Sequence, residues 1–380
     1  MRKNGNGGVM KIGLYDPYLQ TLGGGEKVFL TVLEEAVKLR GAEVTLFAGQ
    51  KPDPAIWRRL NISLKPSAFK WVRADDSTIT EQTEGLDLFV TIRGDIPPAS
   101  RATRSVAIIQ FPFEYLPFKR KKDFVNPFGA LGRLRRMKQQ LAGYDRFAVY
   151  SEFVKEHLQR RFDVGNIVVI GAPVDVPRQK PARKQPIILG VGRFITHGHP
   201  KKQDLMVDAF RELHEQLGVD SGWSLHLAGG ADDSADTRRF IAGLKRAAKG
   251  LPVEFHVNTP YRELVDLYRK ASIFWHAAGA GEDAATYPER LEHFGITTVE
   301  AMMYGAVPVV IGRGGQVEIV DDGKTGYLWQ TPEELFAKTA ELIAEPKRRA
   351  IMGKDAAKAA RRFSKAEFVK RVRRDVLGVT

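Results

Sequence analysis

Residues 292–311 read EHFGITTVEAMMYGAVPVVI, a stretch that predicts a short helix leading directly into a buried strand. The helix is expected at 297–304, and the valine-rich run after it predicts a strand at 307–311. The backbone N–H groups that open such a helix attract anions, because the helix N-terminus carries a partial positive charge. Glu292 and Glu300 flank this point, so the stretch predicts an anion site with a carboxylate on either side.

A structural explanation of the same residues stays open. Thr297 and Glu300 have the spacing of a capping box, in which the glutamate accepts a hydrogen bond from a backbone N–H at the helix start. In the ligand-binding explanation, Glu292 instead holds the hydroxyl groups of a sugar and Glu300 holds a ribose diol. The spacing alone does not decide between these roles.

The alternation of short apolar strands and helices continues in both directions along the chain. Runs rich in β-branched residues and buried on both faces are typical of parallel sheets covered by helices. The predicted strands are 11–15, 43–47, 86–91, 105–110, 146–150, 168–174, 187–192, 223–228, 253–257, 273–276 and 307–311, and the predicted helices are 26–39, 151–161, 203–217, 237–249, 261–270, 297–304, one beginning at 331–334 and a last one at 364–376. The pattern predicts an α/β protein with two doubly wound parallel-sheet domains.

A segment rich in Pro, Arg and Lys near residues 175–184 separates the two alternating series. We therefore place an N-terminal domain at 1–176, a linker at 177–185, a C-terminal domain at 186–360 and a final helical segment at 361–380. In a two-domain protein of this kind, the carboxyl ends of the strands are expected to face a central cleft that holds the ligand.

The composition is that of a globular protein. With 380 residues, of which 43% are hydrophobic and 27% charged, a disordered or fibrous chain is excluded. The absence of cysteine excludes a disulfide framework, a thiolate metal site and a cysteine nucleophile. The N-terminus shows no signal-peptide pattern, and the longest uncharged apolar runs, 105–113 and 304–312, are too short to cross a bilayer. We expect a cytoplasmic protein, soluble or peripheral at the cytoplasmic face of a membrane.

The chain is strongly basic, with 59 Lys and Arg residues against 45 Asp and Glu residues and a net charge of +14 at pH 7. Such a charge suits acidic lipid head groups, phosphorylated substrates or nucleic acid, and solubility alone is the alternative. The sequence contains no recognition module for nucleic acid, so no nucleic-acid partner is predicted.

Several motifs resemble those of the retaining glycosyltransferases of family 4, which have the GT-B fold. Glu292 and Glu300 match the E-x7-E signature of that family, and GRF at 192–194 with KKQDLMVDAF at 201–210 is similar to a second element. Further similar stretches are GGGEK at 23–27, YSEFV at 150–154, PVD at 173–175, LAGG at 227–230, LYRKA at 267–271 and GGQVEIV at 314–320. The resemblance runs through nearly the whole chain and is strongest in residues 187–330.

The resemblance implies two Rossmann-like domains, of which the C-terminal one binds a nucleotide-diphosphate sugar and the N-terminal one binds the acceptor. Arg193 and Lys201 would neutralise the diphosphate as it leaves, and Glu292 would bind the donor sugar near its reacting carbon. These three residues are the predicted catalytic residues. The predicted donor-binding residues are Gly24, Gly25, Arg193, Lys201, Val257, Asn258, Leu264, Glu292, Phe294, Gly295, Ile296, Thr297 and Glu300.

Structural alternatives stay open for two of these groups. Arg193 and Lys201 lie beside His197 and His199, as in an ordinary solvated basic loop. The glycines at 23–25 fit a tight strand–helix turn that needs positive φ. No metal site is predicted, because His197 and His199 have no obvious third ligand beside them.

One stretch departs from the family pattern. Many relatives carry a His-x-Pro-like element after the strand that corresponds to 105–109, whereas this chain reads QFPFE at 110–114. Gln110 cannot exchange a proton at neutral pH, which favours a front-face mechanism in which the leaving phosphate helps to deprotonate the acceptor. Glu114 is a polar substitute at this place.

Residues 111–138 alternate aromatic and basic side chains. This composition suits an anionic membrane interface, where charges meet head groups and rings enter the acyl boundary. A solvated helix with an aromatic core side is the alternative. The predicted acceptor-binding and membrane-binding residues are Gln110, Phe113, Glu114, Lys119, Arg120, Lys121 and Lys122.

The sequence thus predicts a metal-independent, retaining hexosyltransferase without a cofactor. The first choice of donor is GDP-mannose, followed by UDP-glucose, and the acceptor is expected to be a saccharide or a lipid-linked saccharide. Two alternatives stay open, a GT-B nucleotide-sugar epimerase and a non-enzymatic basic binding protein.

Overall fold

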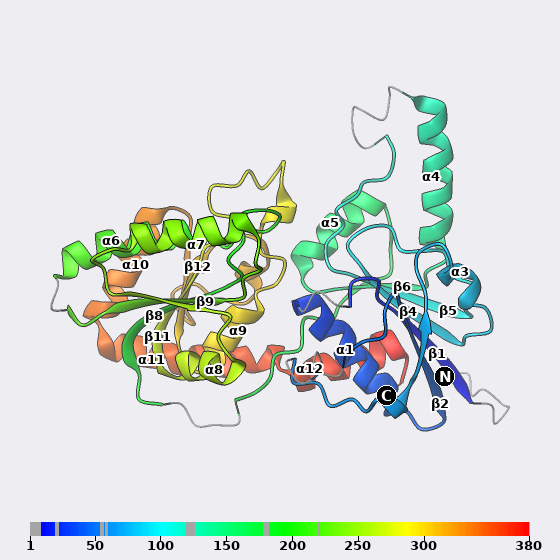
Figure 1. Cartoon of the computed structure of the whole chain (residues 1–380), viewed down its shortest axis with the longest axis horizontal. Helices are drawn as coiled ribbons and strands as arrows, with labels where there is room; N and C mark the ends of the chain where they lie inside the picture. The colour runs from blue at the N-terminus through cyan, green and yellow to red at the C-terminus, as the bar shows by residue number, and fades with distance from the viewer. Residues whose placement is uncertain are drawn as a thin grey trace. The chain divides into compact units, whose positions relative to one another are not determined.

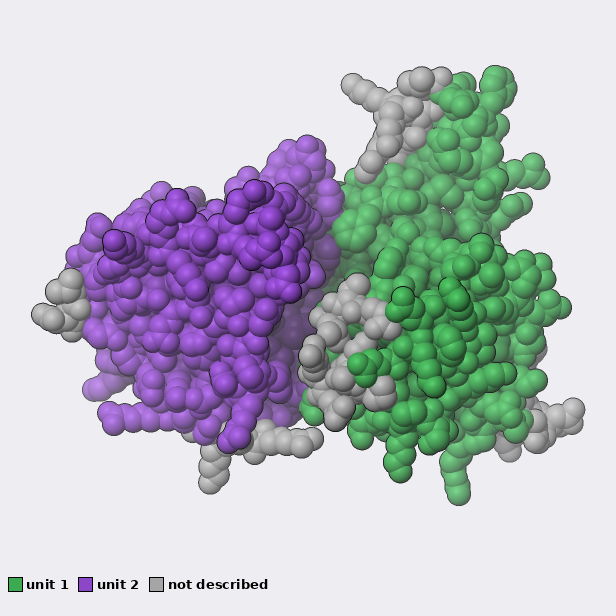
Figure 2. Space-filling view, in the orientation of Figure 1, with its two compact units in different colours: residues 1–173, 365–380 green, residues 174–364 purple. Residues whose placement is uncertain are grey.

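The computed structural model describes residues 9–19, 23–53, 57, 60–118, 126–177, 182–218 and 221–379. The chain divides into two compact units, which Figure 2 colours separately. Unit 1 comprises Met1–Pro173 together with Lys365–Thr380, and unit 2 comprises Val174–Ser364. The predicted linker at 177–185 overlaps the first strand of unit 2, which begins at Gln185.

The sheet of unit 1 is parallel, and its strands lie in the order β3-β2-β1-β4-β5-β6-β7. The strands are β1 (Met10–Tyr15), β2 (Ala42–Ala48), β3 (Lys70–Arg73), β4 (Leu88–Arg93), β5 (Arg104–Ile109), β6 (Arg146–Val149) and β7 (Ile167–Val169). The chain runs from β1 to one edge, returns beside β1 and continues to the other edge, which is the doubly wound arrangement. All residues of the central strand β4 are buried, as expected for a strand covered on both faces.

The helices of unit 1 follow its strands, and a C-terminal segment joins them. They are α1 (Gly24–Ala36), η1 (Pro66–Ala68), α3 (Ile79–Gln82), α4 (Pro127–Ala142), α5 (Glu152–Phe162), α12 (Lys365–Arg371) and the π-helical turn η7 (Val372–Leu377). Ser151 caps α5 as predicted, since its hydroxyl oxygen accepts a hydrogen bond from the backbone N–H of Val154.

Two buried carboxylates on α1 hold the C-terminal segment on unit 1. Glu34 and Glu35 are each only 5% exposed, so their charges need partners. Lys365 Nζ lies 2.8 Å from Glu34 Oε2, and Arg373 Nη1 lies 3.3 Å from Glu35 Oε2. The last residues of the chain therefore pack on unit 1, although unit 2 precedes them in the sequence.

The sheet of unit 2 repeats the same winding, in the order β10-β9-β8-β11-β12-β13, and is also parallel. The strands are β8 (Gln185–Val191), β9 (Ser224–Gly229), β10 (Val253–Val257), β11 (Ala271–His276), β12 (Val307–Ile311) and β13 (Tyr327–Trp329). The helical segments are α6 (Gln203–Leu217), α7 (Ala235–Ala247), α8 (Tyr261–Lys270), η4 (Pro288–Arg290), α9 (Ile296–Met303), η5 (Gly314–Glu318), α10 (Pro332–Ala344), α11 (Pro346–Ala360) and η6 (Arg361–Phe363).

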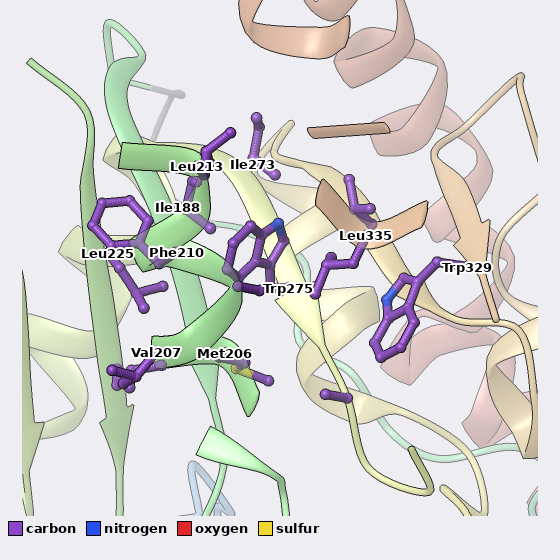
Figure 3. Close-up of a cluster of buried hydrophobic side chains, with 14 of the residues drawn as sticks. Ile188, Met206, Val207, Phe210, Leu213, Leu225, Ile273, Trp275, Trp329 and Leu335 are labelled. Carbon is purple, nitrogen blue, oxygen red and sulfur yellow. The ribbon is translucent and has the colours of Figure 1, made fainter. Parts of the chain in front are cut away.

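The core of unit 2 is centred on Trp275, a fully buried residue of β11 (Figure 3). Met206 and Phe210 of α6 and Leu335 of α10 belong to the same apolar cluster. The indole N–H of Trp275 donates to Thr339 Oγ1 at 2.9 Å, so the polar atom of this large side chain is satisfied. The apolar stripe of α6 predicted from its 3.6-residue period thus faces the sheet.

Most predicted elements of unit 2 agree with the structure within two residues, but several weak elements were missed. β3 and β13 contain four and three residues, too few for a periodic pattern. Helix α11 was not predicted, and α4 was considered only as the alternative of a solvated helix within 111–138. The strand predicted at 168–174 ends at Val169.

Helix α4 is the most unusual element of unit 1. In Figure 1 it extends away from the strands of that unit, and its N-terminal end lies furthest from them. Phe128 and Leu131 near this end are 88% and 58% exposed, which is high for apolar side chains. None of the helices in the described ranges combines the length and apolar character needed to cross a membrane.

Two glycines of unit 2 allow a matched stability test. A Cβ at Gly229 would overlap the carbonyl group of Gly192, whereas a Cβ at Gly243, an exposed position inside α7, would meet no atom within 4 Å. We expect Gly229→Ala to destabilise unit 2 by about 1–3 kcal/mol through overpacking. Gly243→Ala should stabilise it by about 0.5–1 kcal/mol, because alanine favours the helix. Urea unfolding of both variants measures this, and equal midpoints would contradict the close approach of β8 and β9.

Candidate functional site

The strand order of unit 2 reverses between β8 and β11, which are neighbours in the sheet. At such a switch point, the loops after the two strands run in opposite directions and leave a ligand-binding crevice at the carboxyl ends. Arg193 follows β8, and His276 is the last residue of β11. The loop before α9 brings Glu292 to the same place, where it contacts His276.

Glu292 is the centre of a compact charged cluster. Its Oε2 accepts hydrogen bonds from Lys201 Nζ at 2.7 Å and from His276 Nε2 at 2.8 Å. His199 Nε2 lies 4.0 Å from the same oxygen. The side chains of Lys201 and Glu292 are only 17% and 14% exposed, so this ion pair is largely shielded from water. Two residues predicted from the sequence, 91 positions apart, are therefore in direct contact.

Burial and neighbouring charges act in opposite directions on this cluster. Burial would raise the pKa of the Glu292 carboxyl group, but the positive charge of Lys201 and the hydrogen bond from His276 hold that pKa well below its usual range. Burial lowers the pKa of His199, with Lys201 adding to the effect, and burial also lowers the pKa of His276. At neutral pH the Glu292 carboxyl group is therefore ionised, and the imidazoles of His199 and His276 are neutral.

Helix α9 begins at Ile296, one residue earlier than predicted. Its N-cap is Gly295, whose φ of 122° is a conformation that side-chain-bearing residues rarely adopt. Glu300 therefore lies in the second turn, where Tyr268 of α8 donates a hydrogen bond to its Oε2 at 2.9 Å. The capping box considered for Thr297 and Glu300 is wrong, because Thr297 is not the N-cap residue.

Several buried polar atoms around this helix start have no hydrogen-bond partner among the described residues. They are Thr298 Oγ1, both amide atoms of Gln316, His276 Nδ1 and His199 Nε2. The amide of fully buried Gln316 lies against Gly295, since a Cβ there would be 2.7 Å from Gln316 Nε2. Buried polar groups are almost always hydrogen-bonded, so these atoms are suited to a polar ligand at the start of α9.

Arg193 differs from Lys201 in its surroundings. The backbone around Arg193 is held in place, since Gln203 Nε2 donates to the carbonyl groups of Gly192 and Arg193 at 3.2 and 3.0 Å. The Arg193 side chain itself is exposed and has no ion-pair partner in the part of the chain that the structure describes. The alternative of a solvated basic loop thus fits the exposure of Arg193 but not the shielded ion pair of Lys201.

The other predicted donor-binding residues of unit 2 lie on β10, on α8 and at the start of α9, or in the turns next to them. Val257 ends β10, and Asn258 next to it holds the neighbouring loop through hydrogen bonds with the backbone of Ala231 at 2.9 and 3.1 Å. Leu264 is half-buried on α8. Phe294 is buried and packs edge-on against Phe363, so its backbone rather than its ring is available to a ligand. Ile296 and Thr297 are the half-buried first residues of α9.

In unit 1, Gly24 and Gly25 are the first residues of α1 rather than a turn. None of the glycines at 23–25 has positive φ, so the predicted turn explanation is wrong. The structure shows a different reason for Gly25, because a Cβ there would overlap the side-chain amide of Gln110. Gln110 follows β5, so this contact joins a predicted donor-binding residue and a predicted acceptor-binding residue.

The remaining acceptor-side predictions are less well defined by the structure. Phe113 is 50% exposed and packs against Phe111 with ring centroids 5.7 Å apart, and Glu114 is exposed. Lys119, Arg120, Lys121 and Lys122 lie outside the described residues.

Sequence analysis missed three residues that complete the site. They are His276, which binds Glu292, Tyr268, which binds Glu300, and Gln316, which lies against Gly295. A usable signal existed for His276, since it is a polar residue at the end of a predicted buried strand. Tyr268 and Gln316 lie in the family-like stretches 267–271 and 314–320, but nothing in those stretches indicated which residues they would contact.

One known protein family is similar to most of unit 2. Residues 174–359 match the family described as Glycosyl transferases group 1. This range covers unit 2 except for its last five residues. The match agrees with the predicted resemblance to glycosyltransferases over unit 2, while family 4 and the retaining mechanism stay predictions.

Curated relatives include two GDP-mannose enzymes. The chain is 28% identical to a human GDP-Man:Man(3)GlcNAc(2)-PP-Dol alpha-1,2-mannosyltransferase over 239 residues, 58% of this chain and 46% of that protein. It is 32% identical to a Mycolicibacterium smegmatis GDP-mannose-dependent alpha-(1-6)-phosphatidylinositol monomannoside mannosyltransferase over 179 residues, 44% of this chain and 41% of that protein. The chain thus spans less than half the length of these relatives.

Solved structures support the fold of both units. The Anabaena protein HepE in complex with UDP and glucose superposes with a TM-score of 0.67 at 15% sequence identity, covering 97% of this chain and 100% of that one. At this identity, the likeness concerns the fold alone. The predicted α/β fold with two parallel-sheet domains is confirmed and is that of GT-B glycosyltransferase structures.

The histidines of the site predict a loss of stability in mild acid. Burial lowers the pKa of His293 from 6.5 to about 4, and the pKa values of His199 and His276 are lowered as well. Between about pH 4 and 6.5 the unfolded chain therefore binds more protons than the folded chain, and stability falls as the pH falls. His293 alone accounts for at most about 3 kcal/mol of this loss.

Melting temperatures between pH 4.5 and 7.5 measure this effect. We expect His293→Gln to flatten the decrease on the acid side, whereas the matched change His197→Gln, at an 82% exposed side chain, should leave it unchanged. Identical pH profiles for the wild type and His293→Gln would contradict the assignment.

Proposed function

We propose, on the premise that residues 174–359 belong to the Glycosyl transferases group 1 family, that the protein is a retaining hexosyltransferase. The donor would be a nucleotide-diphosphate sugar, with GDP-mannose as the first choice and UDP-glucose as the second. The acceptor would be a saccharide or a lipid-linked saccharide. The observation that carries the proposal is the contact of Lys201 with Glu292 at the switch point of unit 2, beside unpaired polar atoms at the start of α9.

The diphosphate is assigned to the start of α9. The first backbone N–H groups of this helix lack carbonyl partners within the helix, and the partial positive charge there favours an anion. Lys201 and the exposed Arg193 would supply two positive charges that also stabilise the charge developing on the leaving diphosphate. This arrangement would need no metal ion, because the two cations and the helix N-terminus would neutralise the charge of the diphosphate.

Glu292 is assigned to the donor sugar. Its carboxylate keeps its charge because Lys201 and His276 bind the same oxygen, Oε2. Oxygen Oε1 of the same carboxylate would accept hydrogen bonds from sugar hydroxyls near the reacting carbon. His276 would hold the carboxylate in place through its hydrogen bond to Oε2.

Glu300 and its partner Tyr268 are assigned to the ribose. Burial raises the pKa of Tyr268 far above its ordinary value, and Glu300 adds to this effect, so the phenol keeps its proton and continues to donate to the carboxylate. The hydrogen bond fixes one oxygen of Glu300, and this oriented carboxylate would bind the ribose diol. The base would lie towards Val257 and Leu264.

We assign a transfer in which the acceptor approaches the sugar carbon from the face that the diphosphate leaves. The reason is that Gln110, and not a histidine, occupies the position after β5. The bond between the sugar carbon and the phosphate oxygen would break while the acceptor oxygen bonds to the same face of that carbon. The proton of the acceptor hydroxyl would pass to an oxygen of the leaving diphosphate. Gln110 would bind and orient a hydroxyl without taking a proton.

Nucleotide binding and transfer test the donor assignment together. We expect GDP to raise the melting temperature more than UDP or ADP, since a ligand that binds only the folded state stabilises it. Lys201→Met and Glu292→Gln should each lower kcat/KM for transfer from GDP-mannose by about 100-fold or more. The control variant Lys354→Met removes an exposed lysine of α11 and should leave transfer unchanged.

Three results would contradict the proposal. Undiminished transfer by both Lys201→Met and Glu292→Gln would remove the site assignment. Conversion of the nucleotide sugar into an epimer without any acceptor would indicate the epimerase alternative. No melting response to any nucleoside diphosphate would indicate a basic binding protein.

Binding to an anionic membrane is proposed for the projecting end of α4. Phe128, Leu131 and Arg135 follow the three- and four-residue spacing of one helix face, and Arg135 and Arg136 are exposed. Apolar side chains would enter the acyl boundary while the arginines meet acidic head groups. This would bring unit 1 to a lipid-linked acceptor.

Co-sedimentation with phosphatidylserine-containing vesicles tests this surface. At about 0.1 M salt, where exposed charges are screened beyond roughly 10 Å, the wild type should bind, and Phe128→Ser with Arg135→Glu should weaken binding about tenfold or more. The control pair Lys354→Glu with Lys358→Glu lowers the net charge further, from exposed positions of unit 2, and should bind as the wild type does. Equal weakening by both pairs would show that vesicle binding depends on the net charge of the protein and not on α4, and would contradict this proposal.

A further inference from the structure

A second polar cluster of unit 2 lies outside the site described above. His226 is on β9, and Glu254 and His256 are on the neighbouring strand β10. Glu254 pairs with His226 in the parallel register, and His256 follows two residues along, so that all three side chains share one face of the sheet. The alternating residues Leu225 and Leu227 point to the opposite face, where they join the core around α6.

The three side chains converge on one point. His226 Nδ1 and His256 Nε2 are 3.0 Å apart, and Glu254 Oε2 lies 3.7 Å from the first nitrogen and 3.6 Å from the second. A circle through three atoms at these separations has a radius of about 2.0 Å, which is the usual distance from Zn²⁺ to imidazole nitrogen and carboxylate oxygen. An ion at its centre would contact all three atoms without movement of the backbone.

We propose that His226, Glu254 and His256 form a binding site for a transition-metal ion of the zinc class. Two imidazoles and one carboxylate are a common ligand set of such ions. Softer cations prefer thiolates, and harder cations prefer sites made of oxygen atoms alone. The sequence prediction of no metal site considered only His197 and His199, because the distance of 30 positions between His226 and His256 hid their contact.

The surroundings of His226 support a ligand role. Its second ring nitrogen, Nε2, lies 3.0 Å from Ser224 Oγ, so the hydroxyl oxygen can accept a hydrogen bond from Nε2–H, and Nδ1 then carries the lone pair that a metal ion needs. Metal-binding histidines are commonly oriented by such a partner on the other nitrogen. Lys270, one of three cationic residues of the nearby helix α8, is itself ion-paired with Asp266 at 2.5 Å.

An ion can reach this site from solvent. The side chains of Glu254 and His256 are 63% and 23% exposed, whereas His226 is only 9% exposed and forms the inner end of the site. His256 also lines a cavity of about 660 Å³ along α8, with Arg262, Asp266 and Arg269 among its walls. Three protein ligands leave a fourth tetrahedral position for a water molecule on the open side.

A bound ion would act as a clip between β9 and β10, the two strands at one edge of the sheet. Strand β10 leads to Asn258, a predicted donor-binding residue, which hydrogen-bonds the backbone of Ala231 in the loop after β9. Because the ion would bind the folded edge and not the separated strands, it should stabilise unit 2 by mass action. The alternative is a plain hydrogen bond between the imidazoles of His226 and His256, which needs no ion.

The experiment uses the full chain without a histidine tag, stripped with a chelator and dialysed against ZnCl₂. We expect one tightly bound zinc per chain and a rise in melting temperature. His256→Asn and Glu254→Gln, at partly exposed positions, should weaken zinc binding at least tenfold and abolish the melting response. Their melting temperatures without zinc should stay near that of the wild type, which shows that they fold.

Two control variants separate this site from the other histidines. His197→Asn removes an exposed histidine, and Glu292→Gln alters the cluster with His199 and His276. Both should keep the zinc stoichiometry and the melting response of the wild type. Zinc binding that persists in His256→Asn, that is lost in Glu292→Gln, or that is absent from the wild type would overturn the proposal.

Discussion

The ion pair between Lys201 and Glu292 is the interaction on which the site of unit 2 depends. A shielded carboxylate is costly unless charges and hydrogen bonds compensate it, and here Lys201 and His276 both bind one of its oxygens. The pair joins the loop after β8 to the loop before α9. Because each loop is tied to a rigid strand or helix, the charged groups at the switch point are held in position before any ligand arrives.

The doubly wound strand order explains why these loops meet. In both units the first strand of the winding lies inside the sheet, and the chain leaves it towards one edge before returning to its other side. The loops after the two central strands are therefore the ones with space between them. Unit 2 places Arg193 and His276 at these loop starts, and unit 1 places Gln110 after a neighbouring strand, against the start of α1.

The sheet of unit 2 separates its polar residues into two places for a simple reason. Alternate residues of β9 face opposite sides, so Leu225 and Leu227 join the apolar core while Ser224 and His226 face away from it. Polar side chains then collect at the carboxyl ends of the central strands and on the less covered face of the edge strands. The Glu292 cluster occupies the first place, and the cluster of His226, Glu254 and His256 occupies the second.

Local pattern was enough to predict the fold class and most strands and helices, because hydrophobic period and capping residues act within a few positions. The bounds of α6, α8, β10 and β12 agree with the prediction, whereas β3 and β13 were too short to carry a period. The motif similarity also pointed to Lys201 and Glu292. Only the tertiary structure decided which groups touch, since Tyr268 meets Glu300 across 32 positions and His226 meets His256 across 30. Such contacts depend on strand order and register, and these follow from the packing of the whole sheet rather than from any short stretch.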